Sequence, residues 1–350
     1  MFWSFRVLYF SCIIATLVAI AAITGSAYGQ TVRVGLVNSS TDVPFFIADA
    51  KGYLKDEGLN VEFVSFSSAA QMAAPIGTGE LQVGAGAPSV ALYNAVARGV
   101  QMKLIADKAH HPAGGGHAAL LVRKDLVVSG KFKDFTDLRG LKVAVSGLGS
   151  GDESVLNEAL KRGGLKWGDA QPVYMGFPQH PAAFQNGAID ASLTSEPLLT
   201  RTLNAGSAVL FQRNGQFYPD QQSAAVIYGS SFIQNQPEAA RRFTRAYIRG
   251  ARFYNDAILN GRLAGSTAPE VIGILTKYSI IKDAETYKVI TPPAIRPDGK
   301  LNVDSLRKDW QFFKDTGQID GKATVDQVLD NSFVEAALAS LEPYNPTRPK

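Results

Sequence analysis

The feature that most constrains the fold of this chain is an alternation of strand and helix patterns that stops once and then resumes. Between residues 31 and 106, short apolar runs of the strand type alternate with segments of helical periodicity. The sequence HHPAGGGH at 110–117 has no periodicity, and the alternation begins again at Ala118. Such alternation is typical of parallel sheets with helices on their faces. The glycine- and proline-rich interruption predicts a hinge.

The individual elements follow from the periodicity and from the turn residues between them. In the first run we expect strands at 31–37, 61–66, 82–86 and 102–106, and helices at 43–56, 69–76 and 89–98. In the second run we expect strands at 118–123, 142–146, 172–175 and 189–194, and helices at 152–162, 181–185 and 197–203. From Pro237 to the end, the pattern is mostly helical.

The two runs contain similar segments. GELQVG at 79–84 and GAIDAS at 187–192 are each a helix end, a turn and a short strand. We therefore predict two similar α/β lobes: lobe I from 30–116 and 224–350, and lobe II from 117–223. Ligands of open parallel sheets bind beyond the carboxyl ends of the strands, and two lobes can close over a small molecule. The duplication thus predicts a ligand cleft between the lobes.

Residues 1–29 are predicted to be a signal peptide. Arg6 precedes an almost wholly apolar run at 7–24, and small residues follow it. Cleavage after Gly29 or after Ala27 is consistent with the small-residue rule. The alternative is an uncleaved anchor, because about 18 apolar residues can just span a bilayer. We expect a cleaved, exported protein in the periplasm.

Composition excludes several classes of function. The single cysteine, Cys12, lies in the predicted leader, which excludes disulfides, cysteine-rich zinc sites and a cysteine nucleophile from the mature chain. The four histidines, at 110, 111, 117 and 180, lack the spacing of a metal site. No nucleophile motif surrounds Ser146 or Ser150. The net charge of +4 is spread along the chain, which favours anionic small molecules over nucleic acid. We expect no metal, no cofactor and no catalytic residue.

The first candidate site is the glycine-rich segment 146–154, which joins a predicted strand to a predicted helix. Its candidates are Gly149, Ser150 and Gly151, because free amides at a helix N-terminus form a ready anion site. The segment is no dinucleotide motif, since Asp152 stands where a glycine is required, and it lacks the lysine of a phosphate-binding loop. A tight turn that binds nothing remains the alternative.

Further polar residues follow other predicted strands. Asn38, Ser39 and Asp42 come after the first strand, and they either cap the next helix or bind a ligand. Pro88 suits the first turn of a helix, which would leave Ser89 near the N-terminus of that helix. Pro197 suits the first turn of another helix, which would leave Glu196 near its N-terminus. Capping alone explains these residues equally well.

Two more groups complete the candidates. Ser67 and Ser68 form an N-cap signal before the helix at 69–76. In the segment 176–181, Gln179 and His180 would lie beside the cleft, with Phe177 as a stacking surface.

Motifs spread over almost the whole mature chain resemble the periplasmic solute-binding proteins of ABC importers, of the nitrate, sulfonate and taurine type that also includes thiamine-pyrimidine binders. The motifs that carry the resemblance are PFFIA at 44–48, KGYLKDEGL at 51–59, GELQVG at 79–84, DLRGLKVAV at 137–145, GAID at 187–190 with Glu196-Pro197, PDGKL at 297–301 and GQI at 317–319.

The resemblance implies a two-lobed, type II periplasmic binding protein-like fold. It also implies a monomer that captures a small solute by hinge closure and delivers it to a membrane permease of an ABC transporter. The binding loops it implies are those already singled out. One branch of the wider family comprises pyrimidine-synthesising enzymes with a cysteine-rich iron motif, which this chain lacks because it has no cysteine after Cys12.

The chemistry of the solute stays open at the sequence level. Hydroxyls such as those of Ser39 and Ser89 suit a sulfonate or nitrate, whereas Phe45, Phe177 and Tyr218 suit an aromatic or pyrimidine ligand. Glu196 would repel an anion unless it is paired, and it would accept hydrogen bonds from an amino-pyrimidine. The alternatives to an importer component are an exported sensor domain that reports to a membrane receptor and, third, an exported enzyme.

Overall fold

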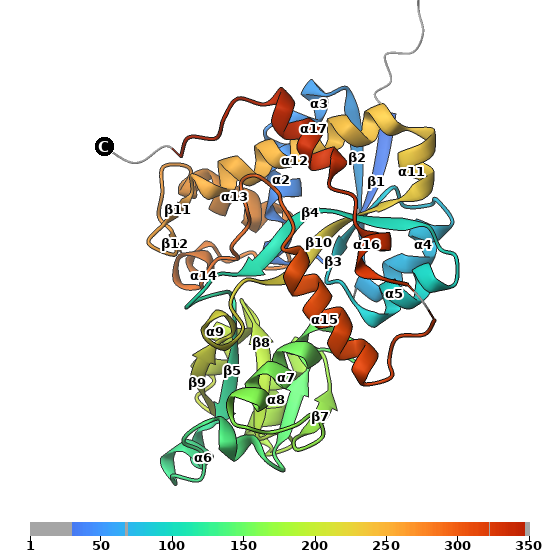
Figure 1. Cartoon of the computed structure of the whole chain (residues 1–350). Coiled ribbons are helices and arrows are strands. Elements are labelled where there is room, and N and C mark those ends of the chain that lie inside the picture. Colours follow the sequence, from blue (N-terminus) through green and yellow to red (C-terminus); the bar gives the residue numbers. More distant parts are fainter. Residues whose placement is uncertain (1–29, 67–68, 322, 347–350) are drawn as a thin grey trace, which may run out of the picture.

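The computed structural model describes residues 30–66, 69–321 and 323–346, and these fold into two α/β lobes, as the alternation predicts (Figure 1). Each lobe is built on a five-stranded sheet. The strand order is β2-β1-β3-β10-β4 in the first sheet and β7-β6-β8-β5-β9 in the second. We use lobe I for the part built on the first sheet and lobe II for the part built on the second. The predicted leader, residues 1–29, lies outside the described residues.

The sheet of lobe I has four strands that run in one direction and one, β10, that runs in the opposite direction. Its strands are β1 (Gln30–Leu36), β2 (Leu59–Ser65), β3 (Val83–Gly86), β4 (Met102–His111) and β10 (Gln221–Gly229). β1 pairs in parallel with β2 and β3, and β10 runs antiparallel between β3 and β4. Its first helices are η1 (Ser40–Asp42), α2 (Val43–Ala50), α3 (Tyr53–Asp56), η2 (Ala69–Met72), α4 (Ala73–Gly77) and α5 (Val90–Ala97).

The chain after β10 completes lobe I, and it is mostly helical as predicted. These elements are α11 (Ser230–Asn235), α12 (Pro237–Asn255), β11 (Ile258–Leu259), β12 (Arg262–Leu263), α13 (Ala268–Tyr278), α14 (Ala284–Val289), α15 (Val303–Asp315), α16 (Val325–Val328) and α17 (Ser332–Ser340). Among the described residues, no helix is both long and apolar enough to cross a membrane.

Lobe II repeats the plan with an antiparallel strand inside a mostly parallel sheet. Its strands are β5 (Ala118–Arg123), β6 (Lys142–Val145), β7 (Gln171–Tyr174), β8 (Ala191–Ser195) and β9 (Ala208–Arg213). β6 is parallel to β7 and β8, whereas β5 is antiparallel to β8 and β9. Its helices are α6 (Lys124–Val128), η3 (Phe135–Leu138), α7 (Gly151–Arg162), η4 (Phe177–Gln179), α8 (His180–Gln185), α9 (Leu198–Asn204) and α10 (Asn214–Phe217).

The chain passes between the lobes twice, from β4 to β5 and from β9 through α10 to β10. The predicted hinge at 110–117 is too long, because His110 and His111 belong to β4 and pair with Gln222 and Gln221 of β10. The residues left between β4 and β5 are 112–117. β10 begins at residue 221, so the predicted return of the chain to lobe I at 224 falls inside that strand.

A large aromatic cluster fixes α2 against α12 in lobe I. Phe45 of α2 is 1% exposed, and its ring centroid lies 4.7 Å from that of Tyr247 and 6.2 Å from that of Phe243. The helix predicted at 43–56 divides into α2 and α3 because Gly52 between them has a φ of 75°, which favours glycine. Burying rings of this size contributes much of the stability of a core.

Candidate ligand site between the lobes

The loops that follow the strands of lobe II touch lobe I. The amide of Val90, at the start of α5, donates a hydrogen bond to the carbonyl of Gly149 (3.0 Å). The amide of Thr291 donates to Oε1 of Glu196 (3.4 Å), and Nε2 of Gln221 donates to the carbonyl of Gly151 (3.4 Å). The structure therefore brings the predicted loops at 149–151 and at 196 to the boundary between the lobes.

The loop after β1 is held by a hydrogen bond within the loop and by contacts with other parts of lobe I. Asn38 has a φ of 54°, and its Nδ2 donates to Oγ of Ser65 (2.6 Å). The amide of Ser39 donates to Oδ2 of Asp42 (2.9 Å). Asp42 is fully buried, and its Oδ1 lies 2.8 Å from Nζ of Lys108, which is also buried. The charge of Asp42 is thus neutralised inside lobe I, so this residue supports the loop and has no free charge for a ligand.

The start of α5 is capped as predicted, with one difference. Oγ of Ser89 accepts a hydrogen bond from the amide of Leu92 (3.4 Å), so Ser89 is the N-cap. Pro88 was expected in the first helical turn, but it precedes the cap because the helix begins at Val90. Ser67 and Ser68 lie outside the described residues.

Two carboxylates from the first turn of α7 accept hydrogen bonds from amides of the loop before the helix. Gly149 has a φ of 69°, and its amide donates to Oε2 of Glu153 (3.1 Å). The amide of Ser146 donates to Oδ2 of Asp152 (3.2 Å). Ser150 is the N-cap residue, and its Oγ is buried without a hydrogen-bond partner among the described residues. At the amide of Gly149 an anion would have to displace the Glu153 carboxylate, and the anion site at the first turn of α7 itself stays a prediction.

Glu196 is buried beside the first crossing, where its amide donates to the carbonyl of His117 (2.7 Å), and the peptide bond to Pro197 is cis. Its Oε2 accepts a hydrogen bond from the amide of Thr200 (3.1 Å). Burial raises the pKa of Glu196, and the hydrogen bonds from Thr200 and Thr291 and the nearby charge of Arg213 oppose that rise. Glu196 is consequently a carboxyl group in contact with both lobes.

His180 cannot offer a ring nitrogen to a ligand in this arrangement. It is fully buried, with Nδ1 2.7 Å from Oγ1 of Thr194 and Nε2 3.3 Å from the carbonyl of Met175. Burial lowers its pKa to about 4, so the ring is neutral at pH 7. Gln179 precedes it at an exposed position, and the Phe177 ring packs edge-on against the imidazole with centroids 5.6 Å apart. The structure thus corrects the role predicted for His180, which is structural.

The two other aromatic candidates also serve packing. Phe45 lies in the core described above and is not available to stack on a solute. Tyr218 is 3% exposed, and its hydroxyl donates to Oδ1 of Asp309 on α15 (2.7 Å). Burial, together with the neighbouring Asp309, raises the pKa of Tyr218. Both interpretations as stacking rings are therefore wrong for this structure, because tertiary partners bury the rings.

Two buried histidine rings pack against each other near the first crossing. The rings of His111 and His117 lie 4.6 Å apart, and burial lowers the pKa of both, which keeps them neutral. Among the described residues, no three side chains of His, Cys, Asp or Glu are arranged to hold a metal ion.

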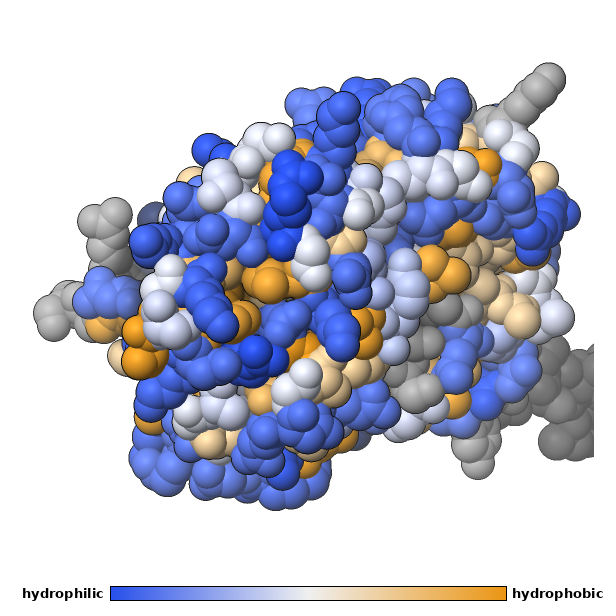
Figure 2. All heavy atoms as spheres, turned by 90° about the horizontal axis from the view of Figure 1, so that it is seen from below, coloured by the Kyte–Doolittle hydropathy of each residue, from blue (hydrophilic) through white to orange (hydrophobic). Residues whose placement is uncertain are grey.

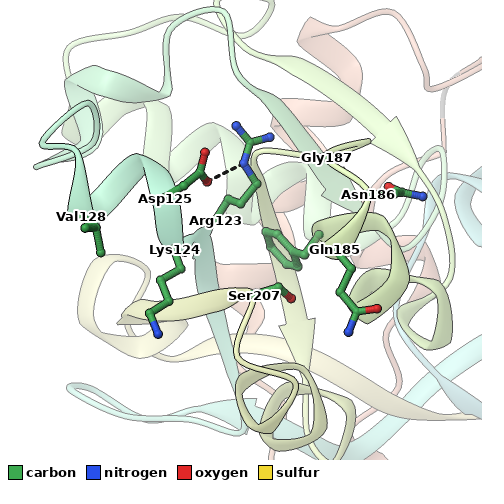
Figure 3. A pocket seen from close by; sticks show the side chains of 9 residues that line it. Arg123, Lys124, Asp125, Val128, Gln185, Asn186, Gly187 and Ser207 are labelled. Atoms are coloured by element: carbon green, nitrogen blue, oxygen red, sulfur yellow. Dashed lines mark hydrogen bonds and ion pairs between the residues drawn. The ribbon is translucent and has the colours of Figure 1, made fainter.

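A surface pocket of about 700 Å³ lies at the other end of the second sheet (Figure 3). Arg123, at the end of β5, and Gly187, just before β8, line it. Because β5 is antiparallel to β8, this is the end of the sheet away from the 149–151 and 196 loops. Seen from below lobe II, the molecule has a mostly polar surface with small, scattered hydrophobic patches (Figure 2). The pocket is therefore separate from the inter-lobe boundary.

Two mostly parallel sheets joined by two crossings, with strand-end loops meeting at the boundary, define the class of two-lobed binding proteins. The profile of the NMT1/THI5-like family matches residues 40–257, and the chain belongs to that family. The sequence is 24% identical to the taurine-binding periplasmic protein of Escherichia coli, over 87% of this chain and 94% of that protein. It is 28% identical to the yeast 4-amino-5-hydroxymethyl-2-methylpyrimidine phosphate synthase THI13, over 58% of this chain and 60% of that protein.

The fold is similar to that of the periplasmic aliphatic sulphonate binding protein SsuA from Escherichia coli. The TM-score is 0.69 at 19% identity, and the match covers 86% of this chain and 92% of that one. This likeness confirms the predicted fold class of a two-lobed periplasmic binding protein.

The sequence patterns did not reveal the roles of Lys108, Glu153 or Asp309. Glu153 carried one signal, since an acidic residue in the first turn of a helix often meets a free amide. Lys108 and Asp309 gave no local signal, because their partners come from distant parts of the chain.

Proposed function

We propose that this protein is the solute-binding component of an ABC importer. It captures a small molecule at the boundary between its lobes, and it delivers that molecule to a permease in the membrane. The observation that carries the proposal is that the loops after β6 and β8 of lobe II contact lobe I, at Gly149 with Val90 and at Glu196 with Thr291. Membership of the NMT1/THI5-like family and the taurine-binding relative support it.

We further propose that the protein acts in the periplasm as a monomer and carries out no covalent chemistry. The predicted leader at 1–29 supports export. One relative is named as a synthase, but the single cysteine of this chain, Cys12, leaves nothing to build a cysteine-rich iron motif in the mature protein. Capture followed by release needs only that the solute binds one arrangement of the lobes better than the other.

The test is a thermal-shift screen of the purified protein. The panel holds nitrate, taurine, alkanesulfonates, aromatic sulfonates and carboxylates, and thiamine pyrimidines. A solute at 100 times its dissociation constant adds about 2.7 kcal/mol to the free energy of unfolding, which shifts the melting temperature clearly. Binding without turnover of the bound compound is the expected result. Chemical conversion of a bound solute, or silence across the whole panel, would contradict the proposal.

A further inference from the structure

The first turn of α7 contains a carboxylate of which only one oxygen is used by the fold. Glu153 is fully buried, and its Oε2 accepts hydrogen bonds from the amide of Gly149 (3.1 Å) and from Nε2 of Gln318 (3.0 Å). Its Oε1 is buried and makes no hydrogen bond to the described residues. A buried polar atom without a partner costs free energy, so such an atom marks a place where a water, an ion or a ligand can complete it. Gln318 belongs to lobe I, so Glu153 lies at the inter-lobe boundary.

The surroundings of Glu153 add further negative charge. Asp152 precedes it in the same turn, and Glu196 follows the neighbouring strand. β6 and β8 are adjacent and parallel, with Ala144 opposite Ser192, so the loops after them leave the sheet side by side. Burial raises the pKa of both Asp152 and Glu196, and only Glu196 has a nearby cation, Arg213, that opposes the rise.

The cations near these loops are already engaged. Nη1 of Arg213 donates to the carbonyl of Gly116 (3.0 Å), and the field of this arginine acts on Glu196. Lys108 is paired with Asp42 inside lobe I. Neither cation contacts Glu153 among the described interactions. Where it met Glu153, a plain anion would face a carboxylate that neither of these two cations contacts.

Two exposed apolar side chains flank this carboxylate. Leu148 is 73% exposed on the loop before α7, and Tyr174 is 47% exposed at the end of β7. Val145 pairs with Tyr174, which puts the tyrosine next to the start of the same loop. Burial, together with a hydrogen bond from the hydroxyl to the carboxylate of Glu153, raises the pKa of Tyr174 to about 12, so the hydroxyl stays protonated. An exposed ring beside a carboxylate suits a positively charged organic group.

We propose that Glu153 selects the solute, and that the solute carries a positively charged nitrogen group such as a primary ammonium or a protonated nitrogen ring. The proposal rests on the proposed function, since it assigns a chemistry to the solute captured between the same lobes. The ammonium donates to the free Oε1 of Glu153 and neutralises the local carboxylates. Solutes that are only anionic, such as nitrate or simple sulfonates, are then poor ligands.

The experiment compares matched probes that differ in the nitrogen. Taurine and isethionate share a sulfonate, but taurine carries an ammonium where isethionate carries a hydroxyl. Benzylamine and benzoate share a phenyl ring, but benzylamine carries an ammonium and benzoate a carboxylate. Isothermal titration calorimetry measures all four on the purified protein, on Glu153→Gln and on the control Glu158→Gln. Glu158 lies on the same helix, but its carboxylate pairs with Lys161 (3.0 Å) and Lys308 (2.6 Å).

We expect the nitrogen-bearing member of at least one pair to bind about tenfold tighter or more than its partner, as charge-assisted hydrogen bonds do. Glu153→Gln reduces that ratio to near one, and Glu158→Gln leaves it unchanged. If isethionate or benzoate binds the unaltered protein and neither amine binds more tightly than its partner, the inference is wrong while solute capture stands. Absence of binding by both amines, or equal effects of the two variants, also overturns it. The comparison in the unaltered protein does not depend on either variant folding.

Discussion

Asp309 of α15 should make the stability of this protein fall as the pH rises from about 4 to 6. The carboxylate is buried and accepts hydrogen bonds from Ser154 of α7, from Tyr218 and from Gln221. Burial raises its pKa from 3.8 to about 6 despite these donors. The folded protein therefore holds the proton more tightly than the unfolded chain does. A difference of about two pKa units corresponds to about 3 kcal/mol, present below pH 4 and lost by pH 6 to 7.

Replacement of Asp309 by asparagine keeps the shape and removes the titration. Urea unfolding of the unaltered protein and of Asp309→Asn, at steps from pH 4 to pH 7.5, isolates this group because all other titrating groups cancel in the difference. The free energy of unfolding of the variant, relative to the unaltered protein, should rise by about 3 kcal/mol across that range. Asp304→Asn is the control, since the Asp304 side chain on the same helix is 95% exposed. A difference between Asp309→Asn and the unaltered protein that does not change with pH would refute the reasoning.

Three further substitutions test the structural roles assigned above. Lys108→Met leaves Asp42 buried without its cation and should lower the free energy of unfolding in urea by about 3 to 5 kcal/mol; a loss below about 1 kcal/mol would contradict the buried pair. Phe45→Ala should lower the free energy of unfolding by about 3 to 5 kcal/mol in the same assay and leave solute affinity unchanged. Lost affinity with unchanged stability would mean that Phe45 contacts the solute. Gly149→Ala strains a φ of 69° and puts a methyl group 2.7 Å from Cβ of Val90, so calorimetry should show several-fold weaker solute binding. Unchanged affinity would mean that the lobes need not meet there.

Much of the fold could be predicted because buried parallel strands leave a strong local pattern. β5 has the predicted bounds, and the other predicted strands start or end within a few residues of the observed ones. β10 escaped because it begins with three polar residues and pairs with β4 through irregular registers. The predicted β4 was too short because the last residues of this strand pair with β10, which lies 110 or more positions later in the chain.

The location of the candidate site could be predicted better than the roles of its residues. The carboxyl ends of parallel strands meet at one edge of a sheet, which is why the 149–151 and 196 loops lie at the boundary. The roles of Tyr218 and His180 depend on partners that the local sequence does not specify. Tyr218 donates to Asp309, 91 residues further along the chain, and His180 is enclosed by Thr194 and Met175. Whether a helix N-terminus is free for an anion depends likewise on the conformation of Glu153.

The contacts between the lobes are of two kinds, which indicates where the molecule pivots. The cluster around Asp309 is buried and has three donors, two of which, Tyr218 and Gln221, belong to the second crossing itself. The contacts of Val90 with Gly149, of Thr291 with Glu196 and of Gln318 with Glu153 are single hydrogen bonds, each worth about 1 to 3 kcal/mol net. Opening that breaks only these single bonds costs little, so a solute needs only a modest preference for the closed form to shift the population. We therefore expect the Asp309 cluster to persist as the pivot and the strand-end loops to separate.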